Sequence, residues 1–174
     1  MKVIVGLGNP GNEYEKTRHN AGKMFLDAAE KSPYGRSAAG RRVRFIFPGG
    51  LMNNSGPALK KSLGKSIKPA DILVIHDDLD IELGRAKFSF GRSSGGHKGV
   101  ESIIKALKTD KFWRLRIGVQ PKRKTDSRKI KDFLLSNFTP TERKLIIKEI
   151  KRLVAVVELW IENPDKAMSI TNQK

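Results

Sequence analysis

His19 is the residue of this sequence best placed to act as a general base. It follows Thr17 and Arg18 in a polar stretch, just ahead of a segment with helical periodicity and close to a glycine-rich loop. Neutral imidazole, with a reference pKa of about 6.5, can accept a proton from water. Such a base works well when a carboxylate fixes its tautomer, and the run His76-Asp77-Asp78-Leu79-Asp80 supplies carboxylates after an apolar segment. By itself, each histidine is more often structural.

Two asparagines lie in tight turns and offer amide groups to a reaction. Asn9 precedes Pro10-Gly11, and Asn53 lies in the turn Met52-Asn53-Asn54-Ser55-Gly56. Asparagine is common in turns for purely local reasons, so either residue alone predicts only a turn. As a pair near a base, the two amides could hold a scissile carbonyl and stabilise its oxyanion.

A divalent metal site is the alternative interpretation of the acidic run. Hard cations prefer oxygen ligands, which this segment offers at Asp77, Asp78, Asp80 and Glu82. Against a metal, Asp77 and Asp78 point to opposite faces if the strand persists, and one such loop rarely closes a site alone. The chain has no cysteine, which excludes thiolate zinc sites, disulfides and cysteine nucleophiles. No serine lies in a G-x-S-x-G elbow, so water is a better candidate for the nucleophile than a side chain.

The segment Gly6-Leu7-Gly8-Asn9-Pro10-Gly11 matches the dinucleotide-binding pattern G-x-G-x-x-G after a strand. That fold requires a helix that opens at the third glycine, so that the pyrophosphate meets its N-terminus. Here residues 12–19 are polar, and helical periodicity begins only near Ala21. The acids Asp27 and Glu30 lie inside that helix, not at the end of a second strand. We therefore reject a nicotinamide-dependent function.

The charge of the chain indicates a polyanionic partner. It carries 35 Lys+Arg against 18 Asp+Glu, a net charge of +17. Between Lys111 and Lys131 nine residues are basic and only Asp126 is acidic. The segment 93–99 leads into a helix N-terminus next to Lys98, an arrangement that either binds an anion or is an ordinary capped turn. A membrane surface is the weaker interpretation, because no basic amphipathic helix with a large aromatic face is present.

Strand and helix patterns alternate along the chain. Strands are predicted at 3–5, 41–47, 72–75, 85–90 and 113–119, and helices from about 21, 55, 98 and 140. Thr139-Pro140-Thr141-Glu142 has the form of a capping box. We expect one α/β domain over residues 1–174, with a twisted, mixed, mostly parallel sheet between two helical layers. No apolar run reaches the roughly 20 residues of a membrane span, and no export signal is present, which favours the cytoplasm.

Five ordered blocks of this sequence resemble the bacterial-type peptidyl-tRNA hydrolases: residues 6–11, Tyr14 with 17–22, 52–56, 76–80 and 95–97. The resemblance extends from Lys2 to about Ala167. It implies a monomeric enzyme that hydrolyses the ester between a peptide and the 3′ adenosine of tRNA, without a metal or cofactor. It also implies His19 as the base, Asp77 as its orienter and Asn9 at the ester. Substrate contacts would come from Tyr14, Leu51, Asn53, Lys98, Lys87 and Arg116, the last two on tRNA phosphate.

The sequence departs from the family pattern in four places. Lys98 stands where the family usually has a substrate-binding asparagine, Leu51 replaces a usual aromatic residue, and Ser89 occupies an often basic position. The segment 32–48 is short, so we expect one strand of the family's sheet to be missing or reduced. A non-catalytic RNA-binding relative of the splicing-factor type is the main alternative. The joint presence of His19, Asp77, Asn9 and Asn53 argues against it.

Overall fold

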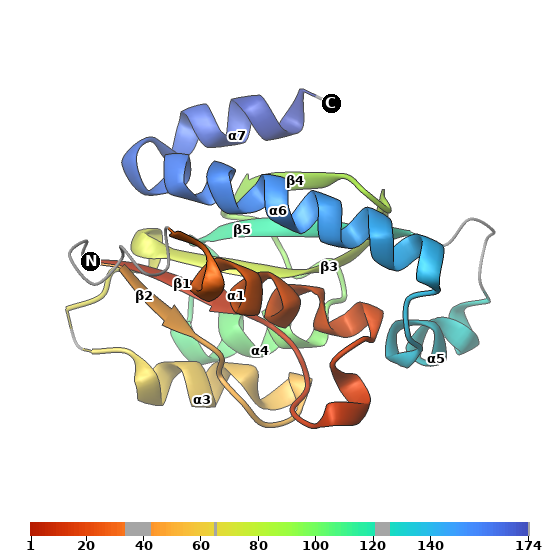
Figure 1. The fold of residues 1–174 in the computed structure, drawn as a ribbon. Coiled ribbons are helices and arrows are strands. Elements are labelled where there is room, and N and C mark those ends of the chain that lie inside the picture. The colour runs from red at the N-terminus through yellow and green to blue at the C-terminus, as the bar shows by residue number, and fades with distance from the viewer. Residues whose placement is uncertain (34–42, 65, 121–125, 174) are drawn as a thin grey trace.

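The computed structural model describes residues 1–33, 43–64, 66–120 and 126–173, and it contains an open five-stranded sheet (Figure 1). The strand order is β2-β1-β3-β5-β4. The first four strands in that order run parallel, and β4 lies antiparallel to β5 at the edge. The bounds are β1 (Lys2–Gly6), β2 (Val43–Ile46), β3 (Ile72–Glu82), β4 (Ala86–Phe90) and β5 (Trp113–Gln120).

Helices cover both faces of this sheet and give three layers (Figure 1). One face packs against α1 (Ala21–Lys31) and α6 (Pro140–Glu162) around a core that includes Phe25, Leu115 and Trp160. The other face packs against α3 (Ser55–Ser62) and α4 (Lys98–Leu107). The last helix, α7 (Pro164–Asn172), lies against α6 and the edge strand β4. The expected three-layer α/β fold with a mostly parallel sheet is confirmed.

Short helical turns carry the residues before the long elements. These are η1 (Asn12–Tyr14), η2 (Arg18–Asn20), η4 (Met52–Asn54), η5 (Pro69–Asp71) and η6 (Ser127–Lys129). The small helix α5 (Ile130–Leu135) follows η6 and lies at the side of the molecule, next to the turns that precede α1 (Figure 1). Because η2 and α5 both sit at the carboxyl ends of the parallel strands, they flank the edge where α/β sheets form their sites.

Most predicted elements are present, and their boundaries show what the sequence pattern could not resolve. The capping box is confirmed: the Thr139 side chain accepts from the Glu142 N–H, and the Glu142 carboxylate accepts from the Thr139 N–H. Helix α3 has no side-chain cap at its N-terminus, and Ser55 lies inside the helix. It is the first helical residue, and its hydroxyl donates to the Met52 carbonyl. The predicted strand 41–47 appears as β2, with residues 41 and 42 outside the described part, as is most of the shortened segment 32–48.

The largest difference concerns β3, which continues through the acidic run instead of ending before it. His76 to Asp80, predicted as a loop, belongs to the strand. The reason is long-range pairing, since β5 stays in register with β3 as far as Asp78 opposite Gly118. Helix α1 packs against these strands at Gly22, where any side chain would clash with the backbone of Leu7 and Ile75. The start of α1 therefore lies directly on the strands, and η2 is held close to β3.

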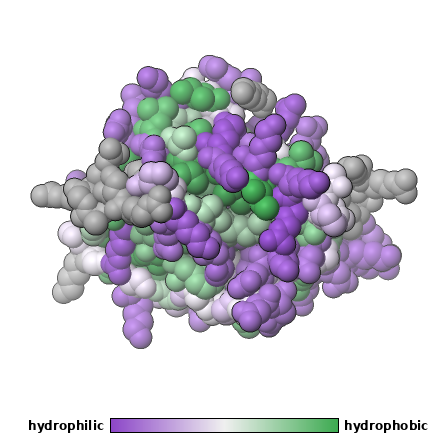
Figure 2. Space-filling view, in the orientation of Figure 1, coloured by the Kyte–Doolittle hydropathy of each residue, from purple (hydrophilic) through white to green (hydrophobic). Residues whose placement is uncertain are grey.

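The surface is strongly polar, and none of the described helices has the length and apolar character needed to cross a membrane. Figure 2 shows hydrophilic residues spread over the face that carries α1 and α6, with hydrophobic patches between them. The first half of α6 contributes exposed basic side chains at Arg143, Lys144, Lys148 and Lys151. The basic side chains of this face therefore belong to α6, a helix that also packs on the sheet.

Candidate active site

The extension of β3 places its two adjacent aspartates on opposite faces of the sheet, because side chains alternate along a strand. Asp78 accepts a hydrogen bond from Arg116 Nε at 2.8 Å. Asp77 points the other way and is 2% exposed. The strand does persist, so Asp77 and Asp78 point to opposite faces and cannot bind one metal ion together.

The Asp77 carboxylate faces two imidazole rings. His19 Nδ1 is 3.0 Å from both carboxylate oxygens, and His97 Nε2 is 2.9 Å from Oδ1. Burial disfavours the charged carboxylate, but the two histidines outweigh it and hold the pKa of Asp77 well below its usual range. Asp77 is therefore an acceptor only, and both nitrogens that face it must carry protons.

This arrangement fixes the tautomer of each histidine. His97 is the N-cap of α4, and its Nδ1 accepts from the Val100 N–H at 3.3 Å, so it is a neutral ring that donates through Nε2. His19 donates through Nδ1, which leaves Nε2 with a free lone pair. Burial by itself lowers the pKa of His19, but the charge of Asp77 and the hydrogen bond to it raise that pKa above 6.5. His19 is thus a base whose basicity is set by Asp77.

The His19–Asp77 pair borders a hollow of about 450 Å³. Its walls come from the end of β3, the segment before α4, and α5. Leu79, Ile130 and Leu134 supply apolar surface, opposite the polar rim formed by Ser94 and Lys98. Since His19 is only 12% exposed, access to its ring runs through this hollow.

Asn9 is held beside η2 by a pair of hydrogen bonds to Asn20. The Asn9 N–H donates to Asn20 Oδ1 at 2.8 Å, and Asn20 Nδ2 donates to the Asn9 carbonyl at 2.9 Å. The Asn9 side chain accepts from the Met52 N–H at 2.9 Å through Oδ1. This bond orients the amide, and Nδ2 has no acceptor among the described residues. A donor of fixed direction is thereby left for a substrate oxygen.

Asn53 and Lys98 meet at a second, more open hollow between α3 and α4. Asn53 follows Met52, so it is tied through the Met52–Asn9 hydrogen bond to the same region. Lys98 lines both hollows, and its amine lies 3.4 Å from the Glu101 carboxylate. Two further family positions lie nearer the surface: Tyr14 is half-buried on η1, and Leu51 is 63% exposed before η4. Neither lines the hollow beside His19.

A basic strip runs along the edge strands on the face that carries Asp78. Lys87 lies directly opposite Arg116 in the β4–β5 pair, and Ser89 lies opposite Arg114. Arg114 is buried, and burial together with the neighbouring Arg116 lowers its pKa to about 10. The Ser89 hydroxyl is also buried and has no hydrogen-bond partner among the described residues. Lys87 is exposed and Arg116 half-buried, so these two cations, rather than the buried Arg114 and Ser89, offer a surface suited to an anion.

Among the described residues, the group whose atoms could hold a metal is His19, Asp77 and His97, not the acidic run. The tautomers argue against a resident ion at this cluster. A metal would need an unprotonated nitrogen on each ring, whereas His97 Nδ1 already accepts a helix N–H and its Nε2 must carry the proton. The hydrogen-bonded arrangement accounts for all three side chains.

Sequence reasoning missed three residues of this region: Asn20, His97 and Arg114. Asn20 directly follows His19. Its role is to hold Asn9 through hydrogen bonds, and a contact between residues 9 and 20 cannot be read from the sequence. His97 belongs to the segment 93–99 at a predicted helix start, but nothing in the sequence shows that this start lies beside Asp77. The alternation of arginines at 114 and 116 marks one face of β5, which was the signal for Arg114.

The dinucleotide interpretation remains rejected. Gly11 precedes only the three-residue 3-10 helix η1, and the first α-helix, α1, begins at Ala21. The segment instead brings Asn9 to Asn20 and Met52, which is a positioning role for an amide.

Comparison with known proteins gives one consistent result. The family model described as peptidyl-tRNA hydrolase matches residues 3–174. A peptidyl-tRNA hydrolase from Aquifex aeolicus is 42% identical over 190 residues, covering 100% of this chain and 97% of the relative. One from Thermodesulfovibrio yellowstonii is 40% identical, covering 99% and 100%. The crystal structure of peptidyl-tRNA hydrolase from Acinetobacter baumannii superposes with a TM-score of 0.88 at 30% identity, covering 99% and 95%. The chain belongs to the peptidyl-tRNA hydrolase family.

Proposed function

We propose that this chain hydrolyses the ester bond between a peptide and the 3′-terminal ribose of tRNA. The observation that carries the proposal is the base: His19, with its tautomer fixed by a buried carboxylate and its Nε2 free at a hollow. Family membership supplies the substrate class, and the charge of +17 suits a polyanion. The chain acts as a monomer on tRNA in the cytoplasm.

In the first step, His19 Nε2 removes a proton from a water molecule in the hollow while the water oxygen attacks the ester carbonyl carbon. The imidazolium that forms is stabilised by Asp77, which keeps its negative charge. The carbonyl oxygen becomes an oxyanion, and Asn9 Nδ2 donates to it. Oriented by Met52, this donor does not need to reorganise during the reaction.

In the second step, the tetrahedral intermediate collapses. The bond between the carbonyl carbon and the ribose oxygen breaks, and the leaving oxygen takes the proton from the His19 imidazolium. The products are a peptide carboxylic acid and tRNA with a free ribose hydroxyl. The base returns to its neutral form, so the cycle as written needs no cofactor or metal.

His97 is a positioning residue in this scheme. It donates a hydrogen bond to the same Asp77 oxygen that His19 contacts, and its own ring is fixed by the start of α4. Asp77 is therefore held in the orientation that His19 requires. Asn53 and Lys98 hold the acyl part of the substrate, while Tyr14 and Leu51 contact the 3′ end of the tRNA.

Phosphate groups of the tRNA bind to the strip formed by Lys87 and Arg116. Both lie across from each other on β4 and β5, with Arg114 and Ser89 as the next pair along. Arg116 is already oriented by Asp78, so its remaining guanidinium donors are pre-positioned. Ser89, at a position that is often basic in the family, is buried and adds no charge to this strip.

Incubation of the purified protein with N-acetyl-aminoacyl-tRNA separates the alternatives. Release of tRNA and acetyl-amino acid, without added cofactor and with chelator present, is the expected result. Tight binding of the same substrate without release would instead support the non-catalytic RNA-binding relative. Loss of release on chelation, restored by a divalent ion, would overturn the metal-free scheme.

A further inference from the structure

Arg18, next to the proposed base, is a buried cation whose guanidinium reaches away from His19 toward the end of α5. Its side chain is 7% exposed. Nη1 donates to the Ser136 hydroxyl at 2.7 Å and to the Asn137 carbonyl at 2.9 Å. Nη2 donates to the Glu142 carboxylate at 2.6 Å. One guanidinium thus joins the end of α5, the connection to α6 and the first turn of α6.

The same guanidinium stacks on aromatic rings from both helices' ends. The Arg18 carbon Cζ lies 4.3 Å from the ring centre of Phe133 in α5, and 5.4 Å from that of Phe138. Backbone bonds reinforce the contact, since the Arg18 N–H donates to the Ser136 carbonyl at 3.2 Å. A planar group with five donors can serve all these partners, whereas a lysine amine cannot.

Helix α5 depends on this contact because η2 is its main packing partner in the described part of the chain, apart from the adjoining η6. In Figure 1, α5 stands at the side of the molecule, away from the layers that cover the sheet. Helix α5 also borders the hollow beside His19, where Ile130 and Leu134 contribute apolar surface. Arg18, which holds α5, directly precedes the base His19 in the sequence.

We propose that Arg18 is a positioning residue that fixes α5 as the wall facing His19, so that base and wall move as one unit. The inference rests on the proposed function and adds to it the means by which the substrate hollow is kept closed on one side. Arg18 contacts neither His19 nor Asp77 through its side chain among the described residues. Its loss thus changes substrate binding and leaves the chemistry of the base intact.

Arg18→Met is the primary test, with Arg143→Met as the matched control. Arg143 is exposed at the start of α6, so the control removes the same charge from the same region without touching α5. We expect Arg18→Met to raise KM for N-acetyl-aminoacyl-tRNA by about 10-fold or more, the usual effect of losing a charged hydrogen-bond anchor, with an unchanged pH midpoint of kcat. A merely structural role would lower kcat through the folded fraction and leave KM unchanged.

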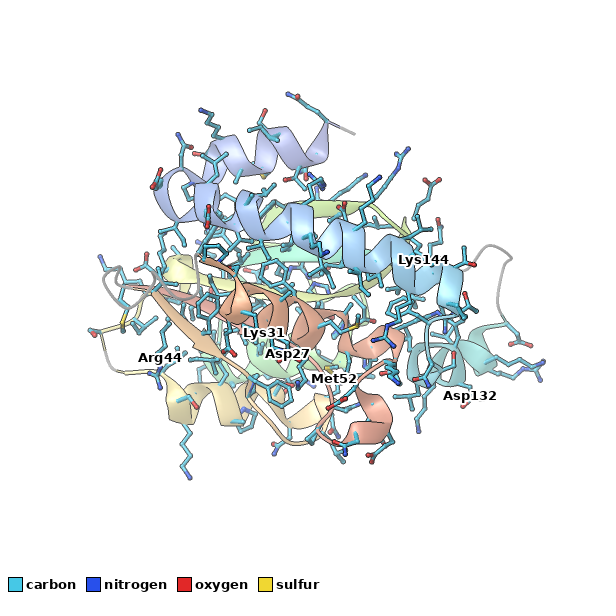
Figure 3. The ribbon with its side chains drawn as sticks, viewed as in Figure 1. Asp27, Lys31, Arg44, Met52, Asp132 and Lys144 are labelled. Carbon is cyan, nitrogen blue, oxygen red and sulfur yellow. The ribbon has the colours of Figure 1, made fainter. Side chains whose placement is uncertain are left out.

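A label on α5 gives a readout that does not depend on activity. The chain has no cysteine, and Asp132 is exposed on α5, so Asp132→Cys accepts a single spin label (Figure 3). We expect the label to become more mobile with Arg18→Met and not with Arg143→Met. If Arg18→Met makes the label more mobile but the wild-type protein releases no tRNA, Arg18 does hold α5 and the proposed function is wrong.

Ser136→Ala is the gentler variant if Arg18→Met does not fold. It removes one acceptor of the guanidinium, the hydroxyl at 2.7 Å, and should give a smaller rise in KM and in label mobility. In a further variant, Arg18→Ala, added guanidinium ion should lower the raised KM part of the way back to the wild-type value. Unchanged KM and unchanged label mobility in every folded Arg18 and Ser136 variant would overturn the proposal.

Discussion

Asp77 is the residue on which the geometry of the site converges. It is buried, ionised, and accepts hydrogen bonds from two neutral rings whose other nitrogens are differently engaged. His97 Nδ1 is tied to a helix N–H, so only His19 retains a free lone pair toward the hollow. The centres of the two rings lie 5.0 Å apart. The rings differ in the nitrogen that does not face Asp77: His97 Nδ1 accepts a helix N–H, whereas His19 Nε2 can accept a proton.

The pH dependence of the reaction follows from the His19–Asp77 pair. His19 must be neutral to act as a base, and its pKa lies above 6.5, so kcat/KM should rise with pH through a midpoint above that value. Asp77→Asn removes the charge that raises this pKa and leaves the burial that lowers it. We therefore expect the midpoint of the variant to move to lower pH, together with a lower plateau. A pH–rate profile with an unmoved midpoint would contradict this electrostatic assignment.

His97→Asn tests the positioning role at the same scale. The amide of asparagine can still cap α4 but cannot reach Asp77 as the ring does. We expect kcat to fall by a smaller factor than for a change of His19 itself, within the range of about 10–100-fold seen for outer partners of site residues, while tRNA affinity stays unchanged. Measurement of kcat and tRNA binding side by side checks it; an equal loss of both would indicate a structural effect.

At the scale of elements, the sequence predicted identities better than boundaries. The need of a base for a carboxylate pointed to the run 76–80, and the family resemblance singled out Asp77, whose side chain lies 3.0 Å from His19. The part played by His97 was not predictable, because it depends on α4 starting beside the end of β3. The extent of β3 also escaped the pattern, since its last residues pair with β5 across some forty positions of sequence. Local signals such as the capping box at Thr139 were read correctly.

The capping box gives a stability prediction at this scale. Thr139→Ala removes the side-chain acceptor for the Glu142 N–H, and loss of an N-cap typically costs about 1 kcal/mol. We expect the free energy of unfolding in urea to fall by that amount. Thr141→Ala, two residues on and exposed, is the control and should unfold like the wild-type protein. Equal stability of both variants would show that the box does not anchor α6.

At the scale of the whole molecule, the net charge of +17 is the feature that the fold alone does not require. Basic side chains occur on the α6 face shown in Figure 2 as well as on the β4–β5 strip. A protein with this excess repels itself, and a polyanionic partner relieves that repulsion. Charge therefore contributes to encounter with tRNA, while the hollow at His19 determines where the ester is cut.

The salt dependence of tRNA binding tests the role of charge. Each phosphate neutralised should lower log K by about 0.7–0.9 per decade of salt. Lys87→Ala should reduce that slope by about 1, as expected for loss of one phosphate contact. Lys60→Ala, on the exposed side of α3 and away from the strip, serves as the control. A binding constant indifferent to salt would mean that the positive charge has another cause.

Single-turnover release of tRNA by His19→Ala tests the central claim most directly. The account predicts release slower by about 100-fold or more, the usual contribution of a general base, with tRNA affinity and the urea unfolding midpoint close to those of the wild-type protein. Release at a near-normal rate by a folded His19→Ala protein would contradict it, because the ester would then be cut without the imidazole.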